Sequence, residues 1–209
     1  MARRKKEPQS VHRKNISIVA EKLFMEKGIN NTSMNDIARE SGYSKATLYV
    51  YFKNKEELVG FLVLESMQKL YEYISNAIVV EDDYEKSYYR ICDAMIEYKK
   101  AYPLYFNMVL DTINIDFDSG NYLPEEMETF KVGEKINALL SEYIQKGISL
   151  GILRSDIEIV PTIKSMWGML SGNIILAFNK KDYLGSLLGK TPEEYLKYGF
   201  NLLYRAITK

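Results

Sequence analysis

The chain has 209 residues, and its 28 Lys and Arg residues balance 28 Asp and Glu residues. This length suits one small module plus one larger domain, each able to bury a core. The single cysteine, Cys92, excludes an intramolecular disulfide and fits a reducing compartment. The charged start MARRKK precedes no apolar stretch long enough for a signal peptide or a membrane span, so we expect a soluble, cytoplasmic protein.

The inventory of reactive side chains argues against an enzyme. The only histidine, His12, lies in the basic N-terminal region, which argues against histidine-dependent catalysis. One Cys and one His cannot form a zinc site of the usual kinds, and neither G-x-x-x-x-G-K-S/T nor a G-x-G-x-x-G after a strand occurs. We therefore expect no catalytic residues, no metal and no cofactor, with paired carboxylates as the one enzymatic alternative left open.

Charge is unevenly distributed along the chain. Residues 1–55 carry twelve basic and five acidic side chains, which leaves sixteen basic and twenty-three acidic ones for the rest. The positive field therefore belongs to the N-terminal quarter, where an anionic partner would bind. Within it, Arg3, Arg4, Lys5 and Lys6 fit either a solvated, disordered tail or a segment that contacts phosphate or the minor groove of DNA.

The first predicted helix covers residues 10–27. Apolar side chains recur there at i, i+3, i+4, i+7 and i+8 from Ile16 to Phe24, and Gly28 ends the helix. Its apolar face should pack against two short helices that follow. A long helix over residues 55–79 comes next, and we expect it to link a domain over residues 1–54 to a second domain over residues 55–209.

The two short helices are joined by a tight turn. Ser33 and Asp36 form an S-x-x-D capping box at the start of the first helix, and Ser44 caps the second. Between them Gly42 permits the positive φ that a sharp reversal between crossed helices needs. The spacing therefore predicts a helix-turn-helix.

In the second short helix, Leu48 and Phe52 lie four residues apart on one face. Ala46, Thr47 and Val50 point the opposite way. One face is thus expected to belong to the core, and the other to remain open to a partner.

The segment from Thr32 to Leu58, TSMNDIARESGYSKATLYVYFKNKEEL, resembles the TetR/AcrR family of bacterial transcriptional repressors. The matching positions are Thr32, Ile37, Ala38, Gly42, Tyr43, Ser44, Leu48, Tyr49, Tyr51, Phe52, Lys55 and Leu58. The resemblance implies an all-α fold in which a three-helix DNA-binding domain precedes a helical ligand-binding and dimerisation domain. It also implies a homodimer that binds a palindromic DNA operator and is released by a small-molecule effector.

By this resemblance, the helix from Ser44 to Phe52 should enter the major groove with several side chains near base edges. Asn35 is expected to reach a base from the preceding helix, whereas Ser33, Tyr51 and Lys55 are expected to contact the phosphate backbone. The complete predicted DNA-binding set is Ser33, Asn35, Ser44, Lys45, Ala46, Thr47, Tyr49, Tyr51 and Lys55.

The rest of the chain has helical patterns, giving about nine helices in all, with breaks at Tyr102-Pro103 and over residues 116–124, 147–156 and 180–192. The predicted helix over residues 161–178 contains two glycines four residues apart, each costing about 1 kcal/mol relative to Ala. Close approach of a symmetric partner would offset that cost, and intrachain packing is the alternative. The predicted dimer interface is Gly168, Gly172, Ile175, Tyr195, Phe200 and Leu203.

Aromatic and Met side chains of the second domain could line an effector cavity, although each could equally be core. The predicted effector-binding set is Tyr98, Tyr102, Phe106, Phe130, Met166 and Trp167. These residues suggest an apolar or aromatic effector. Asp111, Asp116 and Asp118 would suit a cationic one, with a solvated acidic surface as the alternative.

Together these features indicate a ligand-responsive transcriptional regulator that acts as a repressor. Activation of transcription is the alternative for the same kind of regulator. A helical adaptor that binds protein and not DNA is the competing class. Such an adaptor would leave the basic N-terminal segment and the open face of the second short helix unexplained.

Overall fold

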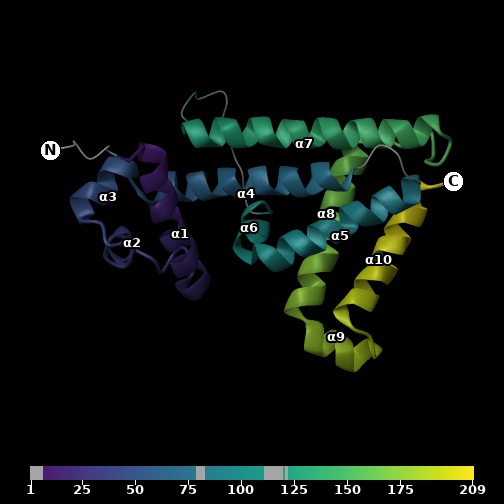
Figure 1. Cartoon of the computed structure of the whole chain (residues 1–209). Helices are drawn as coiled ribbons and strands as arrows, with labels where there is room; N and C mark the ends of the chain where they lie inside the picture. The colour runs from purple at the N-terminus through teal and green to yellow at the C-terminus, as the bar shows by residue number, and fades with distance from the viewer. Residues whose placement is uncertain (1–6, 79–82, 111–119, 121) are drawn as a thin grey trace. The chain divides into compact units, whose positions relative to one another are not determined.

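A computed structural model describes residues 7–78, 83–110, 120 and 122–209, which form ten α-helices and no extended strand (Figure 1). The all-α prediction is confirmed, with one helix more than expected. The predicted basic tail, Val79, Asp111, Asp116 and Asp118 lie outside the described residues. None of the helices in the described part of the chain combines the length and apolar character needed to cross a bilayer.

The chain divides into two compact units that do not follow the predicted domain boundary. Unit 1 comprises residues 1–67 and 104–129, and unit 2 comprises residues 68–103 and 130–209. Two long helices, α4 (Lys55–Ala77) and α7 (Pro124–Ser149), each run without a break from one unit into the other.

Unit 1 is built around α1 (Gln9–Lys27), α2 (Met34–Ser41) and α3 (Lys45–Tyr51), with the start of α4 behind them. Its core consists of apolar side chains from all four helices, as the spacing predicted. The most deeply buried of them are Ile16, Ala20, Leu23, Phe24, Ile37, Leu48, Phe52, Leu58 and Leu62.

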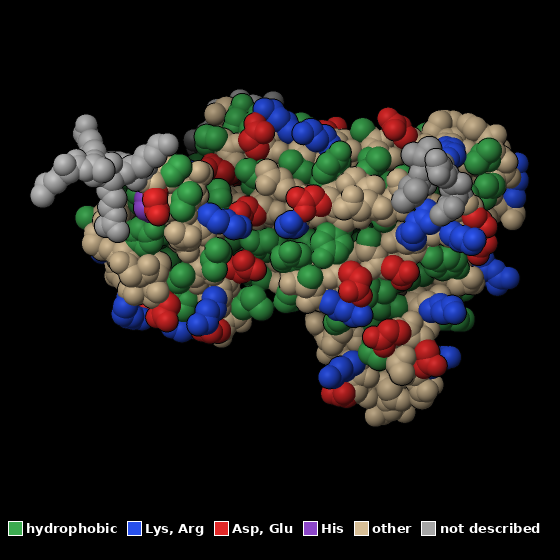
Figure 2. Space-filling model, in the orientation of Figure 1, with side chains coloured by type: hydrophobic (Ala, Val, Ile, Leu, Met, Phe, Trp, Pro, Cys, Tyr) green, Lys and Arg blue, Asp and Glu red, His purple; other side chains and the backbone are tan. Residues whose placement is uncertain are grey.

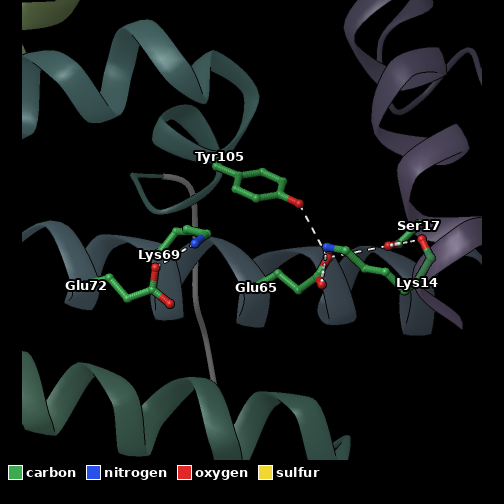
Figure 3. A network of polar contacts seen from close by, with 6 residues as sticks. All are labelled: Lys14, Ser17, Glu65, Lys69, Glu72 and Tyr105. Atoms are coloured by element: carbon green, nitrogen blue, oxygen red, sulfur yellow. Dashed lines mark hydrogen bonds and ion pairs between the residues drawn. The ribbon is translucent and has the colours of Figure 1, made fainter. Parts of the chain in front are cut away.

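A polar network ties the short helix α6 (Pro103–Met108) to α1 and α4 within unit 1 (Figure 3). The carboxylate of Glu65 accepts a hydrogen bond from Lys14 Nζ at 2.6 Å and longer ones from the hydroxyls of Ser17 and Tyr105, both at 3.4 Å. Nearby, burial raises the pKa of the Glu21 carboxyl, and its hydrogen bond with Tyr105 opposes that shift. The Glu65 carboxylate of α4 is thus shared by donors from two other helices, α1 and α6.

Unit 2 contains α5 (Tyr84–Ala101), α8 (Ile159–Asn179), α9 (Lys181–Leu188) and α10 (Pro192–Ile207), together with the remainders of α4 and α7. Helices α8 and α10 run side by side and are joined through α9 (Figure 1). At the start of α10, Thr191 and Glu194 make a reciprocal capping box around Pro192.

Two predicted breaks differ from the structure. The segment over residues 180–192 contains α9, because burial of Leu184 stabilises a helix that Gly185 inside it and Gly189 directly after it obscured in the sequence. Gly147 lies inside α7 and does not end it. A Cβ atom there would lie 2.7 Å from Leu153 Cγ and would overlap the Tyr84 ring, so this glycine provides room for packing.

The Tyr84 ring stacks on the ring of Tyr143, with centroids 4.4 Å apart and planes 6° from parallel. Each hydroxyl donates to the backbone carbonyl of the other residue at 3.1 Å. This reciprocal pair fixes the start of α5 against α7.

Candidate nucleic-acid interface

Helix α2 begins with the predicted capping box. Ser33 Oγ accepts a hydrogen bond from the Asp36 amide at 3.2 Å, and Asp36 Oδ2 accepts one from the Ser33 amide at 3.1 Å. Hydrogen bonds from Ser33 hold the pKa of Asp36 below its ordinary value, with a smaller contribution from Arg39. The Ser33 hydroxyl, one of the predicted phosphate contacts, donates to this carboxylate at 2.5 Å.

The turn between the two short helices depends on Gly42, whose φ of 71° and ψ of 11° lie in the left-handed region. Ser44 then caps α3, because its Oγ accepts a hydrogen bond from the Thr47 amide at 3.1 Å. The Ser44 and Thr47 hydroxyls are also 2.7 Å apart. These bonds fix the direction in which α3 leaves the turn.

Helix α3 has one buried and one open face, as predicted. Leu48 and Phe52 are completely buried, whereas Tyr49 is 41% exposed and Val50 is 71% exposed. Lys45 and Ala46 are also exposed, and Thr47 is half-buried. A seven-residue helix with this division can present side chains to a partner without losing its packing.

A hollow of about 270 Å³ lies between the starts of α2, α3 and α4. It is lined by Thr32, Ser33, Met34, Asn35, Lys45, Tyr49 and Lys55. Five of the nine residues predicted to bind DNA are therefore gathered around one depression. On the face of the molecule shown in Figure 2, acidic and basic side chains are interspersed and form no large patch of one sign.

Lys55 has a structural function that the sequence did not indicate. Its Nζ donates to the backbone carbonyls of Ile29 at 2.9 Å and Thr32 at 3.3 Å. Two of its three donors thus hold the start of α4 against the segment that leads into α2. Asn54 caps the start of α4, because its Oδ1 accepts a hydrogen bond from the Glu57 amide at 2.8 Å.

A second residue missed by sequence reasoning is Arg13 of α1. Its guanidinium carbon lies 4.4 Å from the centre of the Phe52 ring and 5.0 Å from that of Phe61. Its nitrogens form ion pairs with Glu57 at 3.4 Å and Glu125 at 2.6 Å. Arg13 therefore joins α1, the end of α3, α4 and the first turn of α7 within unit 1.

The predicted effector-binding residues are only partly brought together. A cavity of about 60 Å³ in unit 2 is lined by Met166 and Trp167, while the other lining side chains come from α4, α5, α7, α8 and α10. None of its lining residues is charged. The predicted residues Tyr98, Tyr102, Phe106 and Phe130 are not among them, and Phe106 belongs to unit 1.

The predicted dimer-interface residues lie on α8 and α10. A Cβ atom at Gly168 or Gly172 would have no neighbour within 4 Å among the residues that the structure describes, so packing against these residues does not account for the two glycines. Exposed apolar side chains on the same two helices are Val160, Met169, Leu176, Tyr198 and Leu202. Phe200 is only 2% exposed, and we remove it from the interface because its side chain belongs to the chain's own core.

The other predicted interface residues are less deeply buried. Ile175, Tyr195 and Leu203 are half-buried. The Tyr195 hydroxyl donates to Asn173 Oδ1 of α8 at 3.1 Å, which joins the two helices that the predicted interface combines.

Comparison with known proteins agrees with this geometry. Residues 18–60 match the model of the bacterial regulatory proteins of the tetR family. The N-terminal part of the chain is thus similar to the bacterial regulatory proteins of the tetR family. Over 77 residues it is 38% identical to an HTH-type transcriptional regulator of Staphylococcus aureus, a match that covers 37% of this chain and 40% of that relative's length.

Solved TetR-family structures extend the likeness to the whole fold. PfmR of Thermus thermophilus superposes with a TM-score of 0.67 at 23% identity, covering 91% of this chain and 97% of that one. The fatty acid degradation regulator FadR of Bacillus halodurans superposes with a TM-score of 0.66 at 19% identity, covering 96% and 97%. At these identities the matches establish the TetR-family architecture, including the helical second part.

Proposed function

We propose that the protein is a ligand-responsive transcriptional repressor that binds palindromic operator DNA as a homodimer. The observation that carries the proposal is the open face of α3, with Lys45, Ala46, Tyr49 and Val50 exposed beside the hollow at the start of α2. One such helix reaches few base pairs, so two copies would read half-sites about 34 Å apart along the duplex.

In this proposal α3 lies in the major groove, and Asn35, Lys45 and Tyr49 contact base edges. The amides and hydroxyls near the helix starts, together with Tyr51, contact phosphates. Since Lys55 already binds two carbonyls, it contributes mainly by fixing the start of α4 and adds its positive charge to the hollow.

The effector is proposed to be uncharged or largely apolar, because the unit 2 cavity has an apolar lining. The cavity volume of about 60 Å³ is well below the roughly 300 Å³ of the smallest typical ligand sites, so binding requires its helices to separate. Residues of α4 and α7 contribute to the lining, and both helices continue into unit 1. Their displacement would alter the reading helices and release the operator.

The DNA-binding proposal is tested by selecting bound fragments from random duplex DNA and then measuring affinities by fluorescence anisotropy. Lys45→Ala should weaken binding, and Tyr49→Ala should change the preference among operators by about 1 to 3 kcal/mol per affected base pair. Lys22→Ala is the matched control, since this exposed lysine of α1 lies outside the hollow. A protein that enriches no sequence and ignores every duplex at low salt would instead be a protein-binding adaptor.

Effector binding can be followed through Trp167, the only tryptophan, which lines the cavity. A fatty acid is a suitable first probe, because the structurally similar FadR is a fatty acid degradation regulator. Tetraphenylphosphonium tests the cationic alternative. Quenching by the fatty acid, with loss of the DNA complex at the same concentration, would support an apolar effector, whereas a response to the cation alone would contradict it.

A further inference from the structure

The only histidine of the chain lies against the helix-turn-helix and not at a remote surface. His12 of α1 places its Nδ1 atom 2.8 Å from the Tyr43 hydroxyl oxygen, in the turn between α2 and α3. Its ring also stacks on the ring of Tyr51 at the end of α3, with centroids 4.9 Å apart and planes 30° from parallel. A single imidazole on α1 therefore contacts both the turn and the end of α3.

The two tyrosines contact each other as well as the imidazole. Their rings meet edge to face, with centroids 6.1 Å apart. Tyr43 and Tyr51 are both half-buried and stand at the two ends of α3, adjacent to Ser44 and Phe52. A tyrosine hydroxyl in such a position can donate to a phosphate oxygen, as polar side chains flanking a recognition helix commonly do.

The tautomer and the protonation state of His12 together decide where the hydroxyl proton of Tyr43 is used, because only a neutral ring with its proton on Nε2 leaves Nδ1 as an acceptor. If the neutral ring accepts at Nδ1, the Tyr43 hydroxyl donates to it and has no proton left for another acceptor. If the ring is protonated, Nδ1–H donates to the hydroxyl oxygen, and Tyr43 can donate to a phosphate. The imidazolium also adds a positive charge at the end of the reading unit.

Among the described residues, the groups with a contact to the imidazole are Glu7, Tyr43 and Tyr51. Glu7 Oε2 lies 3.9 Å from Nε2, and its side chain is well exposed whereas that of His12 is 21% exposed. An imidazole side chain can be neutral or protonated, and its part in a hydrogen bond changes with its protonation.

We propose that His12 is a positioning residue whose protonation strengthens the contact of Tyr43 with the DNA phosphate backbone, so that operator affinity rises as pH falls. This inference rests on the proposed DNA-binding function. Because the chain contains one histidine, a pH response of an imidazole can be assigned by replacing a single side chain.

The test measures operator dissociation constants of the full chain at pH 6.0 and 8.0 and constant ionic strength. Wild type should bind about tenfold more tightly at pH 6.0, which corresponds to a coupling of one pKa unit. His12→Gln keeps an amide near Tyr43 but cannot titrate, so its affinity should not depend on pH. Tyr43→Phe keeps the ring and loses the hydroxyl, so it should bind more weakly and show a smaller pH ratio.

A wild-type ratio near one with intact operator binding would overturn the role of His12 and leave the proposed function standing. A His12→Gln protein that keeps the wild-type ratio would overturn it as well. Absence of DNA binding at both pH values would instead refute the proposed function. Calorimetry of wild type in two buffers of different ionisation enthalpy counts the protons taken up on binding, and this measurement needs no variant to fold.

Discussion

The guanidinium of Arg13 stacks over the ring of Phe52, which is the last residue of the buried face of α3. The same guanidinium forms ion pairs with Glu57 and Glu125. Arg13→Met substitutes an apolar side chain of similar length, so Glu57 and Glu125 both lose their cation. We expect this change to lower the free energy of unfolding by about 3 kcal/mol, the usual cost of breaking a shielded ion pair on one side.

Chemical denaturation followed by circular dichroism measures this change. Arg39→Met is the matched control, because Arg39 pairs with Asp36 at an exposed surface and should cost about 0.5 kcal/mol or less. Equal losses of unfolding free energy in the two variants would show that stacking on Phe52 and pairing with Glu125 add nothing to the stability of the fold.

The capping box of α2 should make stability depend on pH. Hydrogen bonds from Ser33 lower the pKa of Asp36 from its ordinary value of 3.8 in the folded chain. As pH falls, the Asp36 carboxylate is therefore protonated first in the unfolded chain. Its contribution to the free energy of unfolding is fully present above about pH 4 and is lost as pH falls through the pKa of the folded state. Asp36→Asn should reduce the slope of stability against pH between about pH 5 and pH 3. An unchanged slope would show that the capping carboxylate is not coupled to folding.

Cys92 should report global unfolding. Burial raises the pKa of its thiol to about 12, although a hydrogen bond with Tyr88 opposes that shift. On the order of one thiol in ten thousand is then ionised at pH 8, and a buried thiol is also inaccessible to reagent. Dithionitrobenzoate should label the native protein very slowly and the guanidinium-unfolded protein at once. Rapid labelling of the native protein would mean that α5 opens locally.

The glycines of α8 give opposite expectations for the monomer and the dimer. Gly168→Ala and Gly172→Ala should each stabilise the isolated helix by about 1 kcal/mol, because neither Cβ meets a neighbour among the described residues. If a partner helix approaches there, the same changes should weaken dimerisation in sedimentation equilibrium. Gly185→Ala in α9 serves as the control, since its Cβ would make only an ordinary contact. A more stable chain with unaltered dimerisation would exclude the glycines from the interface.

Local signals were readable in the sequence because the interacting residues are close together along it. The caps at Ser33 and Ser44 each join residues three positions apart, and both have the predicted form. The separation of Leu48 from Val50 on opposite faces follows in the same way from the helical period.

The contacts that organise unit 1 could not be read in this way. Arg13 and Glu125 are 112 residues apart, and neither belongs to a motif that would connect them. Lys55 matched a family position, yet its hydrogen bonds to the Ile29 and Thr32 carbonyls depend on how a loop folds back. The lining of the cavity could not be read from the sequence for a related reason: aromatic composition does not say which face of a buried helix borders empty space, and the lining is largely aliphatic.

The carboxylate of Glu65 has a consequence for how firmly α6 is held. Lys14 and Ser17 reach it from α1, whereas Tyr105 reaches it from α6 through one long hydrogen bond (Figure 3). If Tyr105 withdraws, the lysine still neutralises the acid, and the vacated oxygen can be hydrated at little cost. Within this network Glu65 therefore holds α1 to α4 more firmly than it holds α6, whose attachment depends mainly on the burial of Tyr105, Phe106 and Met108.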